Sequence, residues 1–336
     1  MKRLVLLCDG TWLGADGGRT SNVVHLARAV LPRSCDGIDQ VTCYHEGLGH
    51  GAGMQGIGAA AFGQGIDHDI QSLYRFLVHN YSAGDELFLF GFSRGAYTVR
   101  SLIGMLRNAW LLRKEHGALI PRAYHLYRTK WHADADNALR FREPHAREVR
   151  VRFLGVWDTV GTLGIPLDLF EGFDADRYNF HDTTISRIID RACHALAIDE
   201  RRKPFTPTLW NTRSDRVRTE QAWFSGSHID IGGGHHEAGL SHLSLRWMVE
   251  QAQQSGLAVD NELIERITAK HGASVVHSGI SLPMRLLGTA DRSIGTSNAD
   301  ETLHSSAEQR YLHDPRYRPR NLVQYLERDE QIRLPL

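Results

Sequence analysis

The stretch "LFLFGFSRGAYTVRSLIGML", residues 87–106, narrows most sharply what this chain can fold into. Its first part is a run of apolar and aromatic residues typical of a buried strand, and its second part carries apolar residues at helical spacing. Ser93 stands between Gly91 and Gly95 where the two parts meet. A strand that turns at such a serine directly into a helix has the pattern of a nucleophile elbow. The stretch therefore predicts an α/β fold that exposes a serine at the carboxyl end of a strand.

Other parts of the chain repeat this alternation of strand and helix. Apolar strand-like runs occur at residues 3–8, 40–47, 84–92, 150–159 and, as the expected final strand, from residue 220 into the glycine-rich loop. Helical spacing follows at residues 21–30, 66–77, 99–106, 184–197 and 245–252. Strands that alternate with helices are typical of a parallel sheet covered on both sides. We therefore predict an α/β-hydrolase-like, doubly wound, mostly parallel sheet with helices on both faces.

The chain lacks an internal repeat or a linker-like tract, so residues 1–336 are predicted to form one domain. Residues 110–148 are rich in His, Arg and Asp and read as a cap or insertion, and residues 257–336 read as a C-terminal extension. Residues 47–65 hold eight glycines, too many for a packed element. Because loops at the carboxyl edge of a parallel sheet build its pocket, we expect 47–65 and 110–148 to border the active-site mouth.

Bulk composition excludes several classes of function. The 39 basic and 39 acidic residues cancel, so there is no charge excess that indicates a nucleic-acid partner. The apolar run at Leu4–Cys8 ends at Asp9, too short for a signal peptide, and no apolar window approaches the length of a membrane span. We expect a cytoplasmic protein with no stable membrane span, and leave signal-independent secretion and oligomeric state open. Four cysteines without CxxC spacing are expected to be reduced thiols.

A catalytic serine requires a general base, and the base requires an orienting carboxylate. Asp158 follows the strand-like run "VRFLGVW", and His228 follows "AWFSGS". Both lie at predicted strand ends, in the order Ser, Asp, His that α/β-hydrolases share. We therefore predict Ser93 as the nucleophile, Asp158 as the acid and His228 as the base. Asp199 and Asp230 remain rival acids.

Backbone N–H groups near the serine are candidates for an oxyanion hole. Arg94 begins the helix after Ser93, where N–H groups and the positive end of the helix dipole are available. The loop that follows the first strand adds the N–H groups of Gly10 and Thr11, which we expect near the nucleophile. Asp9 and Asp230 are expected to support these loops, although a purely structural turn explains "CDGTW" almost as well.

Two alternatives compete with a serine hydrolase. One is a metal-dependent phosphoester hydrolase centred on Asp9 and the loop "GGGHHEAGLSH", which holds His235, His236, Glu237 and His242. The spacing of these residues matches no standard ligand motif, so the prediction is a glycine-rich loop with no metal and no cofactor. The other alternative is a catalytically inert binding or regulatory protein on a hydrolase fold. In an inert protein, mutation would be expected to replace one of the three candidate triad residues. Since all three are present, the inert alternative is disfavoured.

Several stretches together resemble the domain of unknown function 2235 family. They are "LLCDGTW", "SNVVHLA", "GFSRGAYTVRSLIGML", "FLGVWDTVG", "HALAIDERRKPFTPTLW" and "WFSGSHIDIGGG", and they run from residue 4 to about residue 250. The resemblance implies an α/β-hydrolase-like fold with Ser93 as nucleophile, Asp158 as acid and His228 as base. The family includes phospholipase effectors of bacterial type VI secretion, which implies lipid substrates and secretion-system partners. Residues and resemblance together predict a serine esterase or lipase that cleaves small-molecule or lipid esters, with phospholipids as candidate substrates.

Overall fold

The computed structural model describes residues 1–10, 20–46, 59–129, 134–160, 184–211, 216–269, 275–278, 288–296 and 300–333. These residues build a central seven-stranded sheet in the order β2-β1-β3-β6-β7-β8-β9, in which every pairing of neighbours is parallel. The predicted α/β fold with a parallel sheet is confirmed. The strands are β1 (Lys2–Cys8), β2 (Asp39–His45), β3 (Glu86–Phe92), β6 (Val151–Trp157), β7 (Ile189–Ala197), β8 (Arg218–Phe224) and β9 (Glu301–Leu303).

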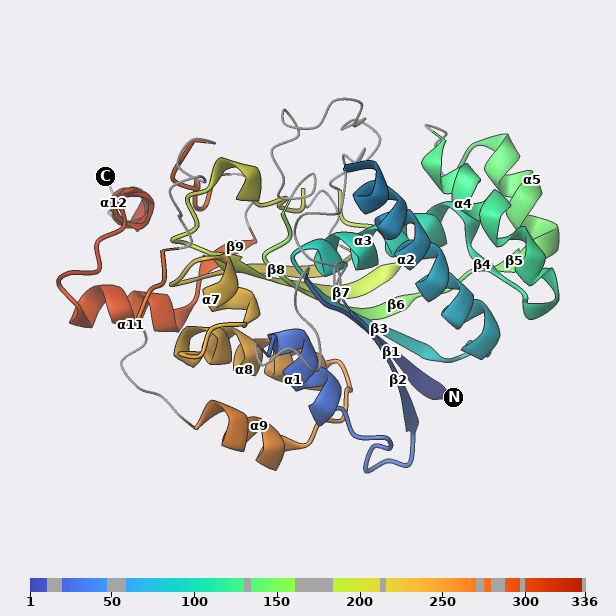
Figure 1. Cartoon of the computed structure of the whole chain (residues 1–336), viewed down its shortest axis with the longest axis horizontal. Coiled ribbons are helices and arrows are strands. Elements are labelled where there is room, and N and C mark those ends of the chain that lie inside the picture. The colour runs from blue at the N-terminus through green and yellow to red at the C-terminus, as the bar shows by residue number, and fades with distance from the viewer. Residues whose placement is uncertain are drawn as a thin grey trace.

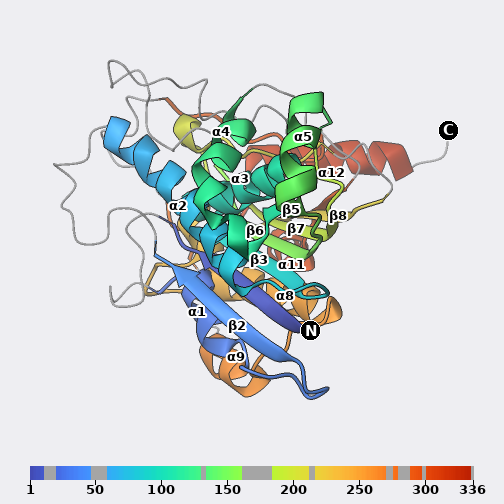
Figure 2. The ribbon, with the colours of Figure 1, turned by 90° about the vertical axis from the view of Figure 1, so that its right-hand side faces the viewer.

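Helices cover both faces of this sheet (Figures 1 and 2). One face carries α1 (Asn22–Ala29), α7 (His228–Gly232), α8 (Gly239–Gln254) and α9 (Asn261–Thr268). The other face carries α2 (Ala59–Asn80), α3 (Arg94–Ala109) and α4 (Ile120–Arg128). Further along the chain, α11 (Ser305–His313) and α12 (Arg320–Arg333) lie at the end of the molecule where β9 closes the sheet.

The two helical layers give the sheet a core on each side. Leu4 and Leu6 of β1 pack into the cluster under α2 and α3, whereas Val5 and Leu7 pack into the cluster under α1 and α8. Successive residues of a strand point to opposite faces, so a strand that is covered twice must be apolar at every position. This is why the strands read as continuous apolar runs rather than alternating ones.

The helix predicted at residues 184–197 is wrong, because Ile189–Ala197 form the strand β7. A helical period fits Ile185, Ile188, Ala192 and Leu196. An apolar stretch of this kind also suits a strand that is buried on both faces. β7 lies between β6 and β8, and eight of its nine positions are buried. Periodicity alone cannot separate such a strand from a buried helix segment.

Two further boundaries differ from those predicted. β8 is not the final strand, because Glu301–Leu303 of the C-terminal extension pair with Gln221–Trp223 as β9. Three residues are too few for the sequence to show a period. Residues 59–65, expected in the glycine-rich loop, instead begin α2 at Ala59, while residues 47–58 lie outside the described part of the chain.

The described parts of residues 110–148 pack against α3, and α5 (Asp136–His145) lies at the end of α3 that is far from Ser93. An antiparallel pair, β4 (Leu111–Leu112) with β5 (Ala146–Arg147), encloses the 3-10 helix η1 (Lys114–Leu119), α4 and α5. Arg142 of α5 reaches the carbonyls of Arg107 and Asn108 in the last turn of α3, at 3.4 and 3.5 Å. Because α3 begins directly after Ser93, its last turn lies at the opposite edge of the sheet. The expectation that residues 110–148 border the site fails for α5, whereas Arg128 at the end of α4 is hydrogen-bonded to Tyr97 in the first turn of α3.

Across the helices that the structure describes, none is both long enough and apolar enough to cross a membrane.

Candidate active site

Ser93 lies in a sharp turn between β3 and α3. Its φ of 56° and ψ of −117° fall in a region that non-glycine residues rarely adopt, and its N–H donates to the Trp157 carbonyl at 3.0 Å. A Cβ atom at Gly95 would lie 2.1 Å from the Cys8 carbonyl oxygen, and one at Gly91 would lie 2.5 Å from the Gly95 carbonyl oxygen. Both flanking glycines are therefore required by close backbone approach, and together they let strand and helix hold the serine in this strained conformation.

His228 is the first residue of the short helix α7, which begins at the end of the loop after β8. Ser227 and Asp230 form a capping box that fixes this helix start, since the Asp230 carboxylate accepts the Ser227 N–H at 2.9 Å. The His228 Nε2 atom lies 2.8 Å from Ser93 Oγ, although 135 residues separate the two along the chain. The imidazole is thus placed to accept the proton of the serine hydroxyl.

Asp158 follows β6 and lies on the other side of the imidazole. Its Oδ2 atom is 2.6 Å from His228 Nδ1, and its side chain is fully buried. Its φ of 38° is another left-handed backbone conformation for a non-glycine residue. The Ala197 N–H donates to Oδ1 at 3.1 Å. The three side chains therefore form one hydrogen-bonded chain, Ser93 to His228 to Asp158, in the arrangement of a catalytic triad.

Arg292 is a partner of Asp158 that the sequence did not reveal. Its Nη1 donates to Asp158 Oδ1 at 2.6 Å and its Nη2 to Oδ2 at 3.0 Å, a bidentate ion pair buried away from solvent. The same nitrogens also donate to the carbonyls of Ala197 and Phe205, at 2.9 and 2.6 Å. Arg292 lies in the C-terminal extension, in a stretch without periodicity, so no local signal marks it.

This arrangement keeps Asp158 ionised. Burial by itself would raise the pKa of the Asp158 carboxyl, but the guanidinium of Arg292 and the hydrogen bond from His228 outweigh it. The pKa of Asp158 is therefore held well below its ordinary value. Asp158 is therefore an anion throughout the physiological pH range.

Two aromatic rings enclose His228, and neither was predicted. The Phe92 ring centroid lies 4.7 Å from that of His228, and the Phe205 ring meets His228 edge-on at 5.0 Å. Phe205 belongs to the 3-10 helix η4 (Lys203–Phe205). Ser93 and His228 are only 8% and 2% exposed. The apolar rings limit water around the imidazole and strengthen its hydrogen bonds to both partners.

The rival acids have other partners. Asp199 accepts hydrogen bonds from the Gly226 N–H at 2.7 Å and the Tyr317 hydroxyl at 2.8 Å, and so braces the loop before His228. Asp230 caps α7 and pairs with His277 at 2.6 Å. Neither carboxylate is hydrogen-bonded to the His228 ring, which leaves Asp158 as the candidate acid.

The expected oxyanion hole is placed only in part. Thr11 lies outside the described residues. Gly10 lies against the nucleophile, since a Cβ atom there would be 3.4 Å from the Ser93 Cβ, but its N–H already donates to Asp9 Oδ1 at 2.7 Å. Gly10 is thus disfavoured as a donor in this arrangement, and the N–H of Arg94 at the start of α3 is the remaining candidate.

Asp9 lies directly after β1 and is hydrogen-bonded to the start of α1 and to β2. Besides the Gly10 N–H, its carboxylate accepts the Ser21 hydroxyl at 2.6 Å and the Tyr44 hydroxyl at 3.0 Å. Burial raises the pKa of Asp9, and these hydrogen bonds lower it in part. Asp9 is absent from the cluster of side chains that could hold an ion in the described part of the chain. These contacts favour a structural role over the centre of a phosphoesterase.

The candidate site occupies the point where the strand order of the sheet reverses. The chain passes from β1 outward to β2 and then returns to β3 on the other side of β1. Gly10 follows β1, Ser93 follows β3 and Asp158 follows β6, so all three lie at the carboxyl edge of neighbouring strands. Parallel α/β sheets bind their ligands at this edge, next to such a reversal.

His194 lies on β7 beside the candidate acid and predicts how stability depends on pH. Its Nε2 accepts the Thr159 N–H at 3.0 Å, and burial together with the nearby Arg100 cation lowers its pKa to about 3. Below about pH 6.5 the unfolded chain binds a proton at this histidine and the folded protein does not. The free energy of unfolding should therefore fall by roughly 1.4 kcal/mol per pH unit on its account between about pH 6 and pH 4.

Urea unfolding at pH 7, 6 and 5 measures this slope. His194→Gln retains an acceptor for Thr159 but does not titrate, so its slope should be shallower than that of the unmodified protein. Two other histidines with lowered pKa, His25 and His304, are unchanged in the variant and cancel in the comparison. Equal slopes in both proteins would contradict the assignment to His194.

Comparison with known proteins gives a matching family and a curated relative from yeast. The family described as "T6SS, Phospholipase effector Tle1-like, catalytic domain" matches residues 2–251. An uncharacterized protein of Saccharomyces cerevisiae is 28% identical over 229 residues, which are 61% of this chain and 32% of the yeast protein. The chain therefore spans about a third of the length of that curated relative.

Two solved structures resemble the chain at low sequence identity. A crystal structure of an uncharacterized protein from Pseudomonas aeruginosa is 19% identical with a TM-score of 0.47, and the match covers 81% of this chain and 51% of that one. A structure of the Tle1 effector bound to the VgrG spike of the type VI secretion system is 19% identical with a TM-score of 0.40. That match covers 70% of this chain and 51% of the effector.

Proposed function

We propose, since this chain belongs to the family of Tle1-like phospholipase effector catalytic domains, that it is a serine hydrolase that cleaves carboxylic ester bonds of lipids, phospholipids among them. Membership of the family makes the chain a hydrolase of the lipase class. The serine mechanism and the ester specificity are our proposal. They rest on the hydrogen-bonded chain of Ser93, His228 and Asp158, whose two links measure 2.8 and 2.6 Å.

In the acylation step, Ser93 Oγ attacks the carbonyl carbon of the ester while His228 Nε2 takes the hydroxyl proton. The Asp158 carboxylate accepts a hydrogen bond from His228 Nδ1–H, so that Nδ1 stays protonated and Nε2 is the basic nitrogen. The same carboxylate stabilises the imidazolium that forms. The carbonyl oxygen becomes an oxyanion, which the N–H of Arg94 and the dipole of α3 are positioned to stabilise.

Collapse of the tetrahedral intermediate breaks the bond between the acyl carbon and the alcohol oxygen. The leaving alcohol takes its proton from His228, and the acyl group remains on Ser93. A water molecule then repeats the sequence: His228 accepts its proton and the hydroxide attacks the acyl carbon. The bond between that carbon and Ser93 Oγ then breaks, and His228 returns the proton to the serine. The products are a free fatty acid and an alcohol, which is a lysolipid when the substrate is a diacyl phospholipid.

The family also motivates a proposal for partners. Its description assigns its members to type VI secretion, and the Tle1 effector in the solved structure is bound to a VgrG spike. We extend this to a proposal that the chain is carried by a secretion spike to lipids of a target membrane. Copurification of the chain with the VgrG protein of its own organism tests the proposal directly.

Labelling with a fluorophosphonate probe tests the serine mechanism. Such probes phosphonylate a serine that a neighbouring base has activated, so the unmodified chain should incorporate one probe molecule per chain. Ser93→Ala removes the reacting oxygen and His228→Gln removes the base, and each should reduce labelling to background. Intact-mass measurement and peptide mapping should place the adduct on Ser93.

A substrate panel accompanies the labelling experiment. We expect hydrolysis of p-nitrophenyl esters and release of fatty acid from phosphatidylcholine or phosphatidylethanolamine vesicles. Asp199→Asn serves as the matched control, because it removes a partly buried carboxylate next to the site that is not hydrogen-bonded to the His228 ring. Labelling that persists in Ser93→Ala, or phosphomonoester cleavage that EDTA abolishes, would argue against the proposed mechanism.

A further inference from the structure

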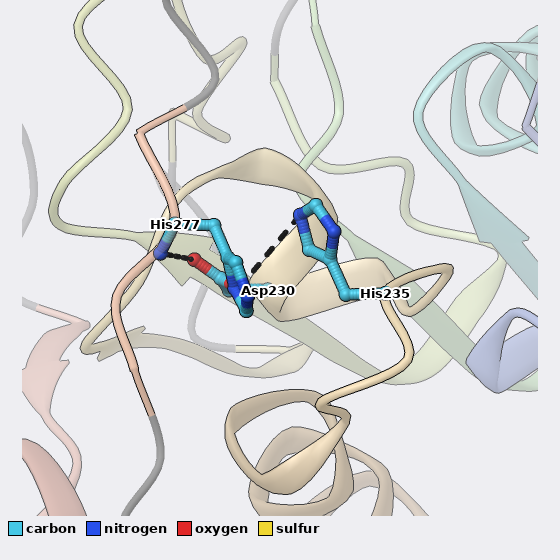
Figure 3. A group of neighbouring side chains, drawn as sticks. All are labelled: Asp230, His235 and His277. Carbon is cyan, nitrogen blue, oxygen red and sulfur yellow. Dashed lines mark hydrogen bonds and ion pairs between the residues drawn. The ribbon is translucent and has the colours of Figure 1, made fainter.

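Three side chains converge beside α7 from two distant parts of the chain (Figure 3). Asp230 is buried on α7, His235 follows in the glycine-rich loop, and His277 comes from the segment 275–278. Each offers a ligand atom, and these atoms all lie within 4.8 Å of one another. Asp230 Oδ1 lies 2.6 Å from His277 Nδ1 and 4.0 Å from His235 Nε2.

We propose that Asp230, His235 and His277 bind a divalent transition-metal ion, with Zn²⁺ as the best fit. Two imidazoles and one carboxylate suit the borderline-soft ions of this class better than Ca²⁺ or Mg²⁺, which take oxygen ligands. Ligands about 2.0–2.1 Å from a tetrahedral Zn²⁺ lie about 3.3 Å apart. The separations of 2.6 and 4.0 Å lie on either side of this value, and all three ligand atoms lie within 4.8 Å of one another, so shifts of about 1–1.5 Å with a turn of the His235 ring convert the cluster into a ligand set.

The Asp230 carboxylate is oriented for this role by the contacts of its other oxygen. Oδ2 accepts the Ser227 N–H at 2.9 Å, the Ser227 hydroxyl at 3.0 Å and the His277 N–H at 3.0 Å. These donors leave Oδ1 directed at the two imidazoles. Ligating carboxylates in metal sites are commonly hydrogen-bonded in this way, which fixes their direction before the ion arrives.

His277 has a second partner of the kind that metal-bound histidines use. Its Nδ1 faces Asp230, and its Nε2 lies 3.8 Å from Glu237 Oε2. A metal-bound imidazole usually donates its other N–H to a carboxylate, which sets the tautomer and strengthens the bond to the ion. Glu237 is more than half exposed and can close this distance. The ring of His235, now stacked on His277 at 4.0 Å, has to turn so that Nε2 meets the ion.

The proposed ion lies apart from the reacting atoms and acts on them only indirectly. Asp230 and His228 are two positions apart on α7, which rotates their side chains by about 200° around the helix axis. The His228 ring meets Ser93 on one side of α7, while Asp230 faces His277 on the other. An ion here would tie the segment 275–278 to the helix that carries the candidate base. It is therefore a structural site, and serine labelling does not require it.

Zinc binding to the full chain, with no histidine tag, tests the site. The protein is dialysed against EDTA and then titrated with ZnCl₂ by calorimetry, with Co²⁺ as a spectroscopic substitute. We expect one equivalent per chain and a rise in Tm with zinc concentration, because an ion that binds only the folded state stabilises it. His235→Gln and His277→Gln should each weaken zinc affinity by about tenfold or more.

His236→Gln is the matched control, because His236 is an exposed neighbour outside the cluster and its loss should leave zinc binding unchanged. His277→Gln also removes the 2.6 Å hydrogen bond to Asp230, whereas His235 Nε2 lies 4.0 Å from that carboxylate. The Tm of each variant without zinc is therefore measured first, which separates loss of zinc binding from loss of folding. Equal affinity in the unmodified protein and His235→Gln, or preference for Ca²⁺ over Zn²⁺, would overturn the proposal. Fluorophosphonate labelling of the EDTA-treated protein tests the serine mechanism without the ion. Failure of the zinc site is therefore distinguishable from failure of the proposed serine mechanism.

Discussion

Replacing Ser93 with alanine is expected to lower kcat for ester hydrolysis by about 10⁶-fold, the loss found when the nucleophile of a serine protease triad is removed. The Ser93 hydroxyl is hydrogen-bonded to His228, and the substitution removes only that oxygen. Alanine has the same backbone preferences at the positive φ of the turn as serine does, so the fold should persist. Thermal unfolding and p-nitrophenyl ester hydrolysis measure the two effects separately.

The same experiment discriminates the triad from a mechanism without a nucleophile. If water were activated directly by His228, Ser93→Ala would retain much of its turnover, and no acyl-enzyme would form. Ser93→Ala combined with His228→Gln should be scarcely worse than Ser93→Ala alone, because residues that act as a unit do not contribute additively. Turnover within tenfold of normal in a folded Ser93→Ala variant would refute the assignment.

The fold and the serine turn were accessible from the sequence because their signals are local. Strand, turn and helix around Ser93 are encoded within residues 87–106, and the two glycines have a steric cause in the backbone contacts of that turn. The positions of Asp158 and His228 follow from a rule of topology, since parallel strands present their carboxyl ends at one edge. Their convergence in space agrees with that rule, and their catalytic roles stay predictions.

The features that were missed depend on contacts between distant residues. Arg292 lies 134 positions from Asp158, and His277 lies 47 positions from Asp230, so no window of sequence contains either pair. Residues 189–197 were assigned to a helix because both faces of a central strand are buried, which erases the alternation that marks a strand. Sequence patterns report burial, whereas partners across the fold are set by packing.

Asp158→Asn is expected to lower kcat by roughly 10⁴-fold, since an amide can bind His228 in the wrong tautomer. The structure adds a second effect, because the substitution leaves the Arg292 guanidinium buried without its counter-ion. Breaking one side of a buried ion pair costs about 3–5 kcal/mol of unfolding free energy. Arg292→Met should destabilise the protein to a similar extent, because among the described residues the Asp158 carboxylate then keeps His228 and the Ala197 N–H as hydrogen-bond partners.

The double variant Asp158→Asn with Arg292→Met separates folding from catalysis. It removes both charges, so its unfolding free energy in urea should recover well beyond the sum of the two single losses. Its kcat should stay as low as that of Asp158→Asn, because the tautomer of His228 is still unspecified. Asp199→Asn, which removes a partly buried carboxylate hydrogen-bonded to Gly226 and Tyr317, should cost about 1–3 kcal/mol of stability with kcat close to normal. Additive destabilisation in the double variant would mean that Arg292 and Asp158 are not energetically coupled. Normal turnover in folded Asp158→Asn would assign the role of the acid to another residue.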